Sequence, residues 1–197
     1  AKIVITGRNK EATDKAVVEI GRGAVGYVSD QSNLNSIDEL VANVKANHDK
    51  VDVLFINAGV AAFAPVEQTP EEMFDTMVNI NYKGAFFTLQ KFIPLMGEGS
   101  SVVNLSSINA YTGMPNTGVY GSTKAALNSI TRTAASELAP KGIRVNSVNP
   151  GPVSTPIFSK VGMPEEALNE FAGAMQQRIP MKRFGEPSEI AKIVTFL

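Results

Sequence analysis

Cysteine is absent from the 197-residue sequence, and histidine occurs once, as His48. The lack of cysteine excludes disulfides, thiolate metal sites and a cysteine nucleophile. A histidine-based zinc site or a Ser-His-Asp triad would need His48, which lies in the polar stretch "NHDK" and is expected in a solvated loop. The sequence therefore indicates chemistry that uses neither a metal nor histidine.

Long charged runs and long apolar runs are also missing. Lys and Arg total 18 against 19 Asp and Glu, and both signs are interspersed. No basic run points to nucleic acid or to an anionic membrane surface. No apolar run reaches the ~18 residues that a membrane span needs, and no signal peptide is visible. The sequence thus predicts a cytoplasmic protein without nucleic-acid or membrane partners.

The stretch "GRGAVG", residues 21–26, matches the G-x-G-x-x-G pattern of dinucleotide-binding turns. Such a turn must follow a strand and open a helix, because the helix N-terminus binds the phosphates. Here the order is reversed, since a helical pattern over residues 9–20 precedes the glycines and the β-branched stretch "AVGYVSD" follows them. These glycines are interpreted as a helix end and a loop, not as a phosphate site.

Strand-like and helix-like segments alternate along the whole chain. The expected strands cover residues 1–7, 24–30, 51–59, 100–107 and 143–151, and the expected helices cover 9–20, 35–49, 69–96, 119–142 and 186–197. The helix over 69–96 is expected to begin with Thr69 as its N-cap and to be one long helix or two abutting ones. Apolar strands between helices predict an α/β domain over residues 1–197, with a single doubly wound, Rossmann-like parallel sheet covered on both faces.

Ligands bind such sheets beyond the carboxyl ends of the strands, which directs attention to the residues that follow each strand. Among the candidates, Ser107 ends a strand, and its hydroxyl could bond a substrate oxygen or could simply close a turn. Asn81 lies in a helical pattern, where Asn is a poor former. It is either a benign irregularity or a residue whose amide is needed locally.

Tyr120 and Lys124 are four residues apart near the start of an expected helix, so they share a face that continues inward as a buried stripe. An ammonium beside a phenol lowers the tyrosine pKa from ~10, which would make Tyr120 an acid/base near neutral pH. The alternative is a chance pair, since this composition gives such a spacing in roughly one sequence in four.

Several motifs in order resemble the short-chain dehydrogenase/reductase family of the compact type: "INAG" at 56–59, "NINYKGAFF" at 79–87, Ser107, "YGSTK" at 120–124 and "NPGPVSTP" at 149–156. The resemblance runs over residues 1–197. Members carry a T-G-x-x-x-G-x-G turn after their first strand, which this chain lacks. The resemblance implies that residues 1–9 form the family's second strand. The first strand, the Gly-rich turn and the first helix (~30 residues) would then lie outside the chain, as would the last strand.

The resemblance also implies an oxidoreductase that interconverts a ketone or aldehyde and a secondary alcohol by direct hydride transfer. Tyr120 would be the general acid/base, Lys124 would hold the nicotinamide ribose, and Ser107 would steady the substrate oxygen. Asn81 would anchor a proton-relay water through Lys124. The implied cofactor-binding residues are Gly7, Arg8, Asp30, Asn57, Ala58, Gly59, Tyr120, Lys124, Pro150, Gly151, Val153 and Thr155.

The residues at the end of the expected strand over 1–7 favour NADP(H) over NAD(H). Gly7 leaves room where an acid would repel a 2′-phosphate, and the Arg8 guanidinium suits phosphate geometry, although a plain surface arginine is the alternative. Residues 157–175 correspond to the family's substrate lid. The apolar side chains of this lid, together with two nearby apolar side chains, point to an apolar ketone or secondary alcohol as the substrate. The alternative is that they only pack the lid. These residues are Phe158, Val161, Met163, Phe171 and Met175, with Tyr111 and Met114.

Self-association as a homodimer or homotetramer is a further implication of the resemblance. The helices after Thr69 and over 120–139 would pack against their copies, and small residues such as Ala125 and Ser129 would permit close approach. Two other interpretations stay open. The chain could be a non-catalytic nucleotide-binding or scaffold protein on the same fold, because fold does not fix function. It could also be a fragment that does not bind cofactor.

Overall fold

The computed structural model describes residues 1–155 and 165–197. Its described strands are all parallel and form two sheets, of two and of three strands. β1 (Val4–Gly7) pairs with β2 (Val25–Val28), and β3 (Val53–Ile56), β4 (Ser101–Leu105) and β5 (Arg144–Val148) follow in the order β3-β4-β5. The α/β alternation is confirmed. The expected single sheet is instead divided, because β1 and β3 do not pair with each other or with a common strand in the described chain.

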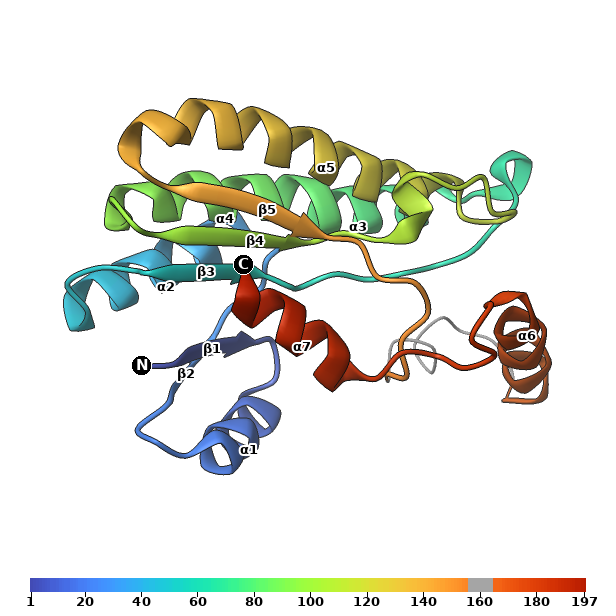
Figure 1. Cartoon of the computed structure of the whole chain (residues 1–197), viewed down its shortest axis with the longest axis horizontal. Coiled ribbons are helices and arrows are strands. Elements are labelled where there is room, and N and C mark those ends of the chain that lie inside the picture. The colour runs from blue at the N-terminus through green and yellow to red at the C-terminus, as the bar shows by residue number, and fades with distance from the viewer. Residues whose placement is uncertain (156–164) are drawn as a thin grey trace.

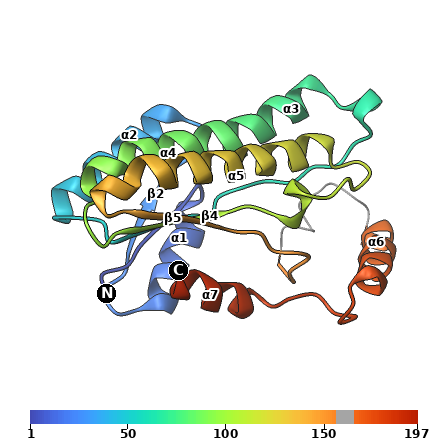
Figure 2. The same cartoon turned by 45° about the horizontal axis from the view of Figure 1, so that its top comes forward.

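Helices lie on both sides of the strands, in three layers (Figures 1 and 2). The helices are α1 (Lys10–Ile20), α2 (Leu34–Asn47), α3 (Glu71–Met77), α4 (Ala85–Phe92), α5 (Gly118–Leu138), α6 (Glu165–Arg178) and α7 (Pro187–Phe196). Helices α2, α3, α4 and α5 form the upper layer in Figure 2, and α1 and α7 lie on the other side of the strands. Helix α6 stands at the end toward which the strands point (Figure 1).

The main apolar core lies between the three-stranded sheet and helices α4 and α5. Val102 of β4 is fully buried, and Leu127 of α5 is 2% exposed. A smaller cluster joins α2 to α4 through Leu40, Val44 and Phe92, and Val4 of β1 and Tyr27 of β2 pack against it. The small cluster therefore connects the two sheets.

The glycines of residues 21–26 end a helix, as the sequence predicted. Gly21 follows the last residue of α1 with φ 61°, and its N–H donates to the Val17 carbonyl. Gly23 also has positive φ, at 72°, and β2 begins two residues later. The left-handed backbone explains both glycines without any phosphate.

One local expectation was wrong, and another holds only in part. Thr69 does not cap α3: its hydroxyl donates to the Pro65 carbonyl instead, and Pro70 occupies the N-cap position without a side-chain hydrogen bond. His48 lies in the loop directly after α2, as expected, but it is only half-exposed, and its Nε2 atom is buried with no hydrogen-bond partner among the described residues. The polar sequence around each of the two residues did not reveal where its side chain lies in the structure.

The segment expected as one helix or two is continuous but changes its winding in the middle. Between α3 and α4 lies the π-helix η2 (Val78–Gly84), and Asn81 is at its centre with 1% exposure. Such wide turns occur frequently at functional sites. The helix irregularity at Asn81 is thus observed, and its amide makes the local contacts described below.

Candidate functional site

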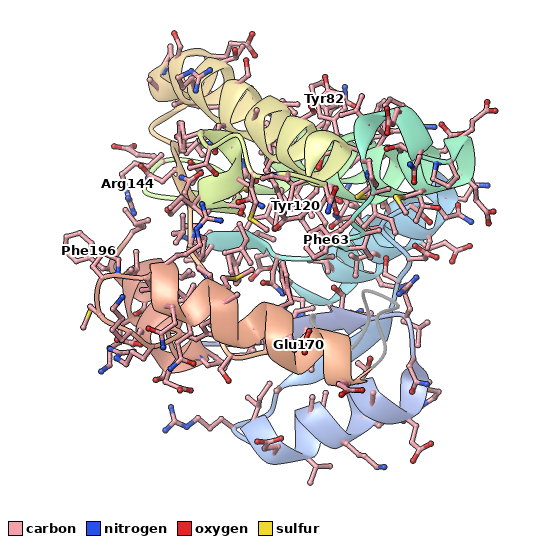
Figure 3. The ribbon with its side chains drawn as sticks, turned by 90° about the vertical axis from the view of Figure 1, so that its right-hand side faces the viewer. Phe63, Tyr82, Tyr120, Arg144, Glu170 and Phe196 are labelled. Carbon is pink, nitrogen blue, oxygen red and sulfur yellow. The ribbon has the colours of Figure 1, made fainter. Side chains whose placement is uncertain are left out.

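The carboxyl ends of β3, β4 and β5 and the start of α5 surround one cleft of about 740 Å³. Tyr120 and Phe63 lie close together there, between the upper helices and α6, in a view onto this end of the molecule (Figure 3). Ser107, Asn57 and Gly151 line the same cleft. The structure thus brings together residues that are up to 94 positions apart in the chain, from Asn57 to Gly151.

Tyr120 and Lys124 share one face of α5, as their spacing predicted. Lys124 is 4% exposed, and its Nζ lies 5.9 Å from the centroid of the Tyr120 ring. The ammonium donates to the Leu105 carbonyl at the end of β4, at 2.8 Å. The Ser106 hydroxyl donates to the Lys124 carbonyl at 3.0 Å and so also ties the segment after β4 to α5. A buried lysine held in this way is consistent with a functional pair rather than a chance spacing.

The expected lowering of the Tyr120 pKa is not what the structure shows. Burial raises the pKa of Tyr120, and the hydrogen bond with Ser107 opposes this shift. Burial also lowers the pKa of Lys124, to about 8. Desolvation is thus the largest influence on the phenol and exceeds the opposing effect of the Ser107 hydrogen bond.

Ser107 lies two residues beyond the end of β4 at Leu105, close to the strand end at which the sequence placed it. It is 8% exposed, and its hydroxyl lies within hydrogen-bonding reach of Tyr120. The same hydroxyl oxygen accepts the Asn109 N–H at 3.2 Å, which caps the short helix η4 (Ile108–Ala110). Turn closure, one of the two alternatives posed for Ser107, is therefore observed, and a bond to a substrate oxygen stays a prediction.

The Asn81 amide is fully engaged by neighbouring groups. Its Oδ1 accepts the Val60 N–H at 2.8 Å, and its Nδ2 donates to the Val60 carbonyl at 2.9 Å and to the Thr123 hydroxyl at 3.2 Å. Thr123 in turn donates to the Tyr120 carbonyl at 2.8 Å. Asn81 is thus connected to the start of α5 through a residue that sequence reasoning missed, although Thr123 stands within the quoted motif "YGSTK".

Asn57, Ala58 and Gly59 form an exposed loop directly after β3. A Cβ added at Gly59 would lie 3.2 Å from Asn81 Oδ1 and 3.4 Å from Lys124 Nζ. The absence of a side chain at Gly59 therefore keeps open a polar cradle beside the ammonium and the amide. An exposed backbone next to a buried cation fits the ribose hydroxyls of a nicotinamide nucleotide.

Arg8 and Asp30 lie at the carboxyl ends of the two paired strands, β1 and β2. Ser32 donates to Asp30 Oδ1 from its hydroxyl at 2.7 Å and from its backbone at 2.9 Å, and with nearby Arg8 it lowers the pKa of Asp30. Gly7 has a packing reason of its own, since a Cβ there would lie 2.6 Å from Thr13 Oγ1 of α1. The interpretation of Gly7 as room for a phosphate is therefore not required.

The loop after β5 forms the opposite wall of the cleft. The Pro150 carbonyl accepts the Ile108 N–H at 2.9 Å, and apart from the two chain neighbours no described residue comes within 4 Å of a Cβ added at Gly151. Val153 bridges to Gly185 before α7, and Thr155 also lines the cleft. Phe158, Val161 and Met163 of the expected lid lie outside the described residues.

Aromatic rings connect the cleft to α6. Phe63 meets Tyr120 edge-on at 6.5 Å between centroids, and it meets Phe171 of α6 at 6.0 Å. Arg178, in the last turn of α6, is the one Lys, Arg, Asp or Glu among the described lining residues. Sequence reasoning missed Phe63 and Arg178, although Phe63 stands four residues after the "INAG" motif.

Other kinds of site are not evident in the described part of the chain. Those residues contain no group of three or more His, Cys, Asp or Glu side chains arranged to hold a metal ion. None of their helices is long and apolar enough for a membrane span. A second hollow of about 480 Å³ lies at the amino ends of β1 and β2 beside Lys2 and His48, and it includes none of the predicted site residues.

The chain is similar to known proteins in both sequence and structure. The family described as enoyl-(acyl carrier protein) reductase matches residues 1–197. The 3-oxoacyl-(acyl-carrier-protein) reductase FabG of Thermotoga maritima is 36% identical over 203 residues, covering 100% of this chain and 80% of the relative. The solved short-chain dehydrogenase/reductase of Brucella melitensis, described as a glucose/ribitol dehydrogenase, has a TM-score of 0.91 at 32% identity and covers 100% and 78% of the two chains. A 3-ketoacyl-(acyl-carrier-protein) reductase from the same organism, complexed with NADH, has a TM-score of 0.89 at 30% identity and covers 100% and 80%.

Proposed function

The chain belongs to the short-chain dehydrogenase/reductase family of oxidoreductases, which use nicotinamide cofactors and act on CH–OH and C=O groups, and we propose that Tyr120 is its general acid/base. One observation carries the proposal: the Tyr120 phenol and the Ser107 hydroxyl line one cleft within reach of each other, and the buried Lys124 ammonium lies 5.9 Å from the centroid of the Tyr120 ring. A phenol between a hydroxyl and a cation can give up or take a proton at an adjacent substrate oxygen.

Each residue has a distinct part in the proposed reduction of a carbonyl. When bound, the nicotinamide supplies the hydride that reaches the substrate carbon. Tyr120 donates its proton to the substrate oxygen, and Ser107 donates a hydrogen bond to that oxygen while charge develops on it. Lys124, whose pKa is lowered to about 8, is still mostly protonated at neutral pH and stabilises the phenolate that remains. In the direction of alcohol oxidation the same groups act in reverse.

The cofactor would be held along the edge formed by the strand ends. Asn57, Ala58 and Gly59 would contact the adenine ribose, and Lys124 would bond the nicotinamide ribose. Pro150, Gly151, Val153 and Thr155 would surround the nicotinamide. We propose NADP(H) rather than NAD(H) because Arg8 is exposed beyond β1 and a guanidinium binds phosphate well. This preference rests on Arg8, since Gly7 is explained by its contact with Thr13.

The walls of the cleft suggest the character of the substrate. Phe63, Met114, Met175 and Ile179 are apolar, whereas Arg178 is a cation at the end of α6. We propose a largely apolar carbonyl compound with an anionic group that reaches Arg178. Replacing Arg178 with Gln should raise KM for an oxo acid and leave KM for its methyl ester unchanged. Equal effects on both would assign Arg178 to the helix dipole alone.

We also propose that the protein self-associates through α3, α4 and α5. Phe74, Tyr82 and Phe86 are exposed along the first two helices and the π-helix between them, by 48%, 39% and 40%. Small side chains such as Ala125 and Ser129 are exposed on α5, which contacts the same helices. Light scattering that shows only monomers at micromolar concentration would overturn this assignment.

The activity is tested with a substrate panel and both reduced cofactors. Ketones, aldehydes and a 3-oxoacyl thioester should oxidise the nicotinamide, followed by its absorbance. Reduction of an enoyl thioester alone would replace carbonyl reduction by double-bond reduction. Cofactor binding without turnover of any substrate would favour the non-catalytic nucleotide-binding alternative. Failure to bind either cofactor would favour the interpretation as a non-binding fragment.

A further inference from the structure

Gln31 lies in the turn between β2 and α2, directly after Asp30, and its side chain bridges two distant backbone segments. The amide nitrogen donates to the Ile80 carbonyl at 2.9 Å and to the Ala58 carbonyl at 3.1 Å. Because a glutamine amide has two N–H donors, these two bonds use its full donor capacity. One side chain thus holds three segments that the proposed site uses.

The Ile80 carbonyl lies where the helix changes its winding. Ile80 is 8% exposed and belongs to the π-helix η2, in which the wide turn interrupts the regular four-residue hydrogen-bond ladder. At the end of η2 the Ala85 N–H donates to the Tyr82 carbonyl, three residues back. The Gln31 amide binds the Ile80 carbonyl from outside this irregular segment and so ties it to the turn after β2.

Gly84 shows independently that the turn and the π-helix are fitted together. A Cβ at Gly84 would lie 2.0 Å from the Gln31 carbonyl oxygen and 2.7 Å from Gln31 Cγ. The backbone of Gly84 is ordinary helix, with φ −63° and ψ −42°, so its conformation does not require glycine. Glycine is needed there because the Gln31 backbone approaches too closely for any side chain.

Both carbonyls that Gln31 holds belong to the surroundings of Lys124. Ile80 precedes Asn81, whose amide binds Val60 and Thr123. Ala58 precedes Gly59, where an added Cβ would contact both Asn81 Oδ1 and Lys124 Nζ. A shift of either carbonyl would therefore change the cradle beside the ammonium.

We propose that Gln31 is a positioning residue that joins the nucleotide-binding turn to the π-helix and fixes the Asn81 amide relative to Lys124. The proposal rests on the proposed function of Tyr120 and Lys124. Gln31 touches neither reacting atoms nor the phenol, so its effect passes through Asn81 and the Asn57–Gly59 loop.

The first test is Gln31→Met, which keeps the length of the side chain and removes both donors. We expect kcat to fall about tenfold or more, while KM for the carbonyl substrate stays within about twofold. The matched control is Gln68→Met, because Gln68 is exposed and its side chain makes no hydrogen bond recorded in the described structure. An unchanged kcat, or a loss confined to cofactor binding, would overturn the proposal.

A double-mutant cycle tests whether Gln31 acts through Asn81. In an Asn81→Ala background, Gln31→Met should lower kcat by much less than it does in the wild type, because the amide that it positions is gone. Full additivity of the two effects would assign Gln31 to general stability and contradict the proposal.

Gln31→Glu provides a variant that keeps the packing if Gln31→Met fails to fold. An ionised carboxylate repels the two carbonyl oxygens, whereas a protonated carboxyl can donate to one of them. The kcat of the variant relative to wild type should therefore recover as the pH falls. A ratio independent of pH would count against the proposal.

A measurement without turnover separates this proposal from the proposed function. The Val60 N–H donates to Asn81 Oδ1, so its hydrogen exchange reports the position of that amide directly. Gln31→Met should accelerate Val60 exchange about tenfold or more, while core amides such as that of Val102 keep their rates. Normal Val60 exchange would overturn the role of Gln31 even in an active enzyme, and accelerated exchange would support it even if Tyr120 proved dispensable.

Discussion

The central strand of the three-stranded sheet is buried far more deeply than the two-stranded sheet, whereas its edge strand β3 is not, since Val53 is 60% exposed. In β4, Val102 and Val103 are completely buried, and α5 adds Leu127 and Leu138 to the same core. In the two-stranded part, Val28 of β2 is 55% exposed and Val18 of α1 is 81% exposed. We refer to β3, β4, β5, α4 and α5 as the catalytic half and to β1, β2 and α1 as the nucleotide half.

The difference in burial has a consequence for the candidate site. Tyr120, Lys124 and Ser107 all stand on elements of the catalytic half or directly after them, where packing fixes their positions. Arg8 and Asp30 stand on the nucleotide half, which depends on contacts such as those of Tyr27 and Gln31 with the rest of the molecule. The main core thus fixes the positions of the acid/base residues. Selection of the nucleotide instead depends on how the nucleotide half packs against the rest of the molecule.

The largest stability effect should follow from a cavity in the catalytic half. Leu127→Ala removes a side chain that is 2% exposed and should cost about 2–5 kcal/mol of unfolding free energy. Val18→Ala in the nucleotide half should stay within about 0.5 kcal/mol, because that side chain is already in water. Urea unfolding of both variants measures the contrast. Similar costs in the two halves would remove the distinction on which the comparison depends.

The next effect concerns cofactor choice in the nucleotide half. Arg8→Ala should weaken NADPH binding by about 10- to 100-fold, the scale of one or two charge-assisted hydrogen bonds, and leave NADH binding almost unchanged. Arg144→Ala serves as the control, because Arg144 is exposed at the amino end of β5, away from the cleft. Fluorescence titration gives both dissociation constants. An equal loss for both cofactors would make Arg8 a plain surface residue.

The contact between Gly84 and Gln31 can be broken without touching the cleft. Gly84→Ala places a methyl group 2.0 Å from the Gln31 carbonyl and should cost about 1–3 kcal/mol through forced separation of the two segments. Gly97→Ala is the matched control, since within the described part of the chain only its own neighbours come within 4 Å of a Cβ there. Hydrogen exchange should show the β1 and β2 amides of Gly84→Ala losing protection before those of β4. Uniform loss across both sheets would mean that the halves unfold as one unit.

A further effect is the pH dependence of stability that Lys124 contributes. Burial lowers the pKa of Lys124 to about 8 in the folded state, against an ordinary value of ~10.4 in the unfolded chain. Between these values the unfolded state binds more protons, so the unfolding free energy gains a term that rises with pH across this window. Lys124→Met should lack that rise and, at neutral pH, should unfold at a higher urea concentration than wild type. Parallel pH profiles for the two proteins would contradict the lowered pKa.

Local patterns in the sequence were enough to predict most elements and the edge of the sheet where the site lies. Apolar spacing placed α1, α2 and α5, and the rule for carboxyl ends directed attention to Ser107 and the Asn57–Gly59 loop. The motif spacing also gave the approach of Lys124 to Tyr120.

Interactions between distant segments could not be predicted in the same way. The bond from Gln31 to Ile80 joins residues 49 positions apart, and neither residue carries a local signal of the pairing. The contact of Gly7 with Thr13 and the division into two sheets likewise depend on packing. The pKa of Tyr120 was predicted in the wrong direction because a sequence shows the neighbouring charge but not the depth of burial.

The central claim, that Tyr120 transfers the proton, is tested most directly by Tyr120→Phe, which removes the hydroxyl and keeps the ring. Because Phe63 packs against the ring edge, the variant should fold and bind the reduced cofactor as wild type does. Its kcat for carbonyl reduction should fall by about 10²-fold or more, the scale of lost general acid catalysis. A Tyr120→Phe enzyme with unchanged cofactor affinity and wild-type kcat would contradict the account.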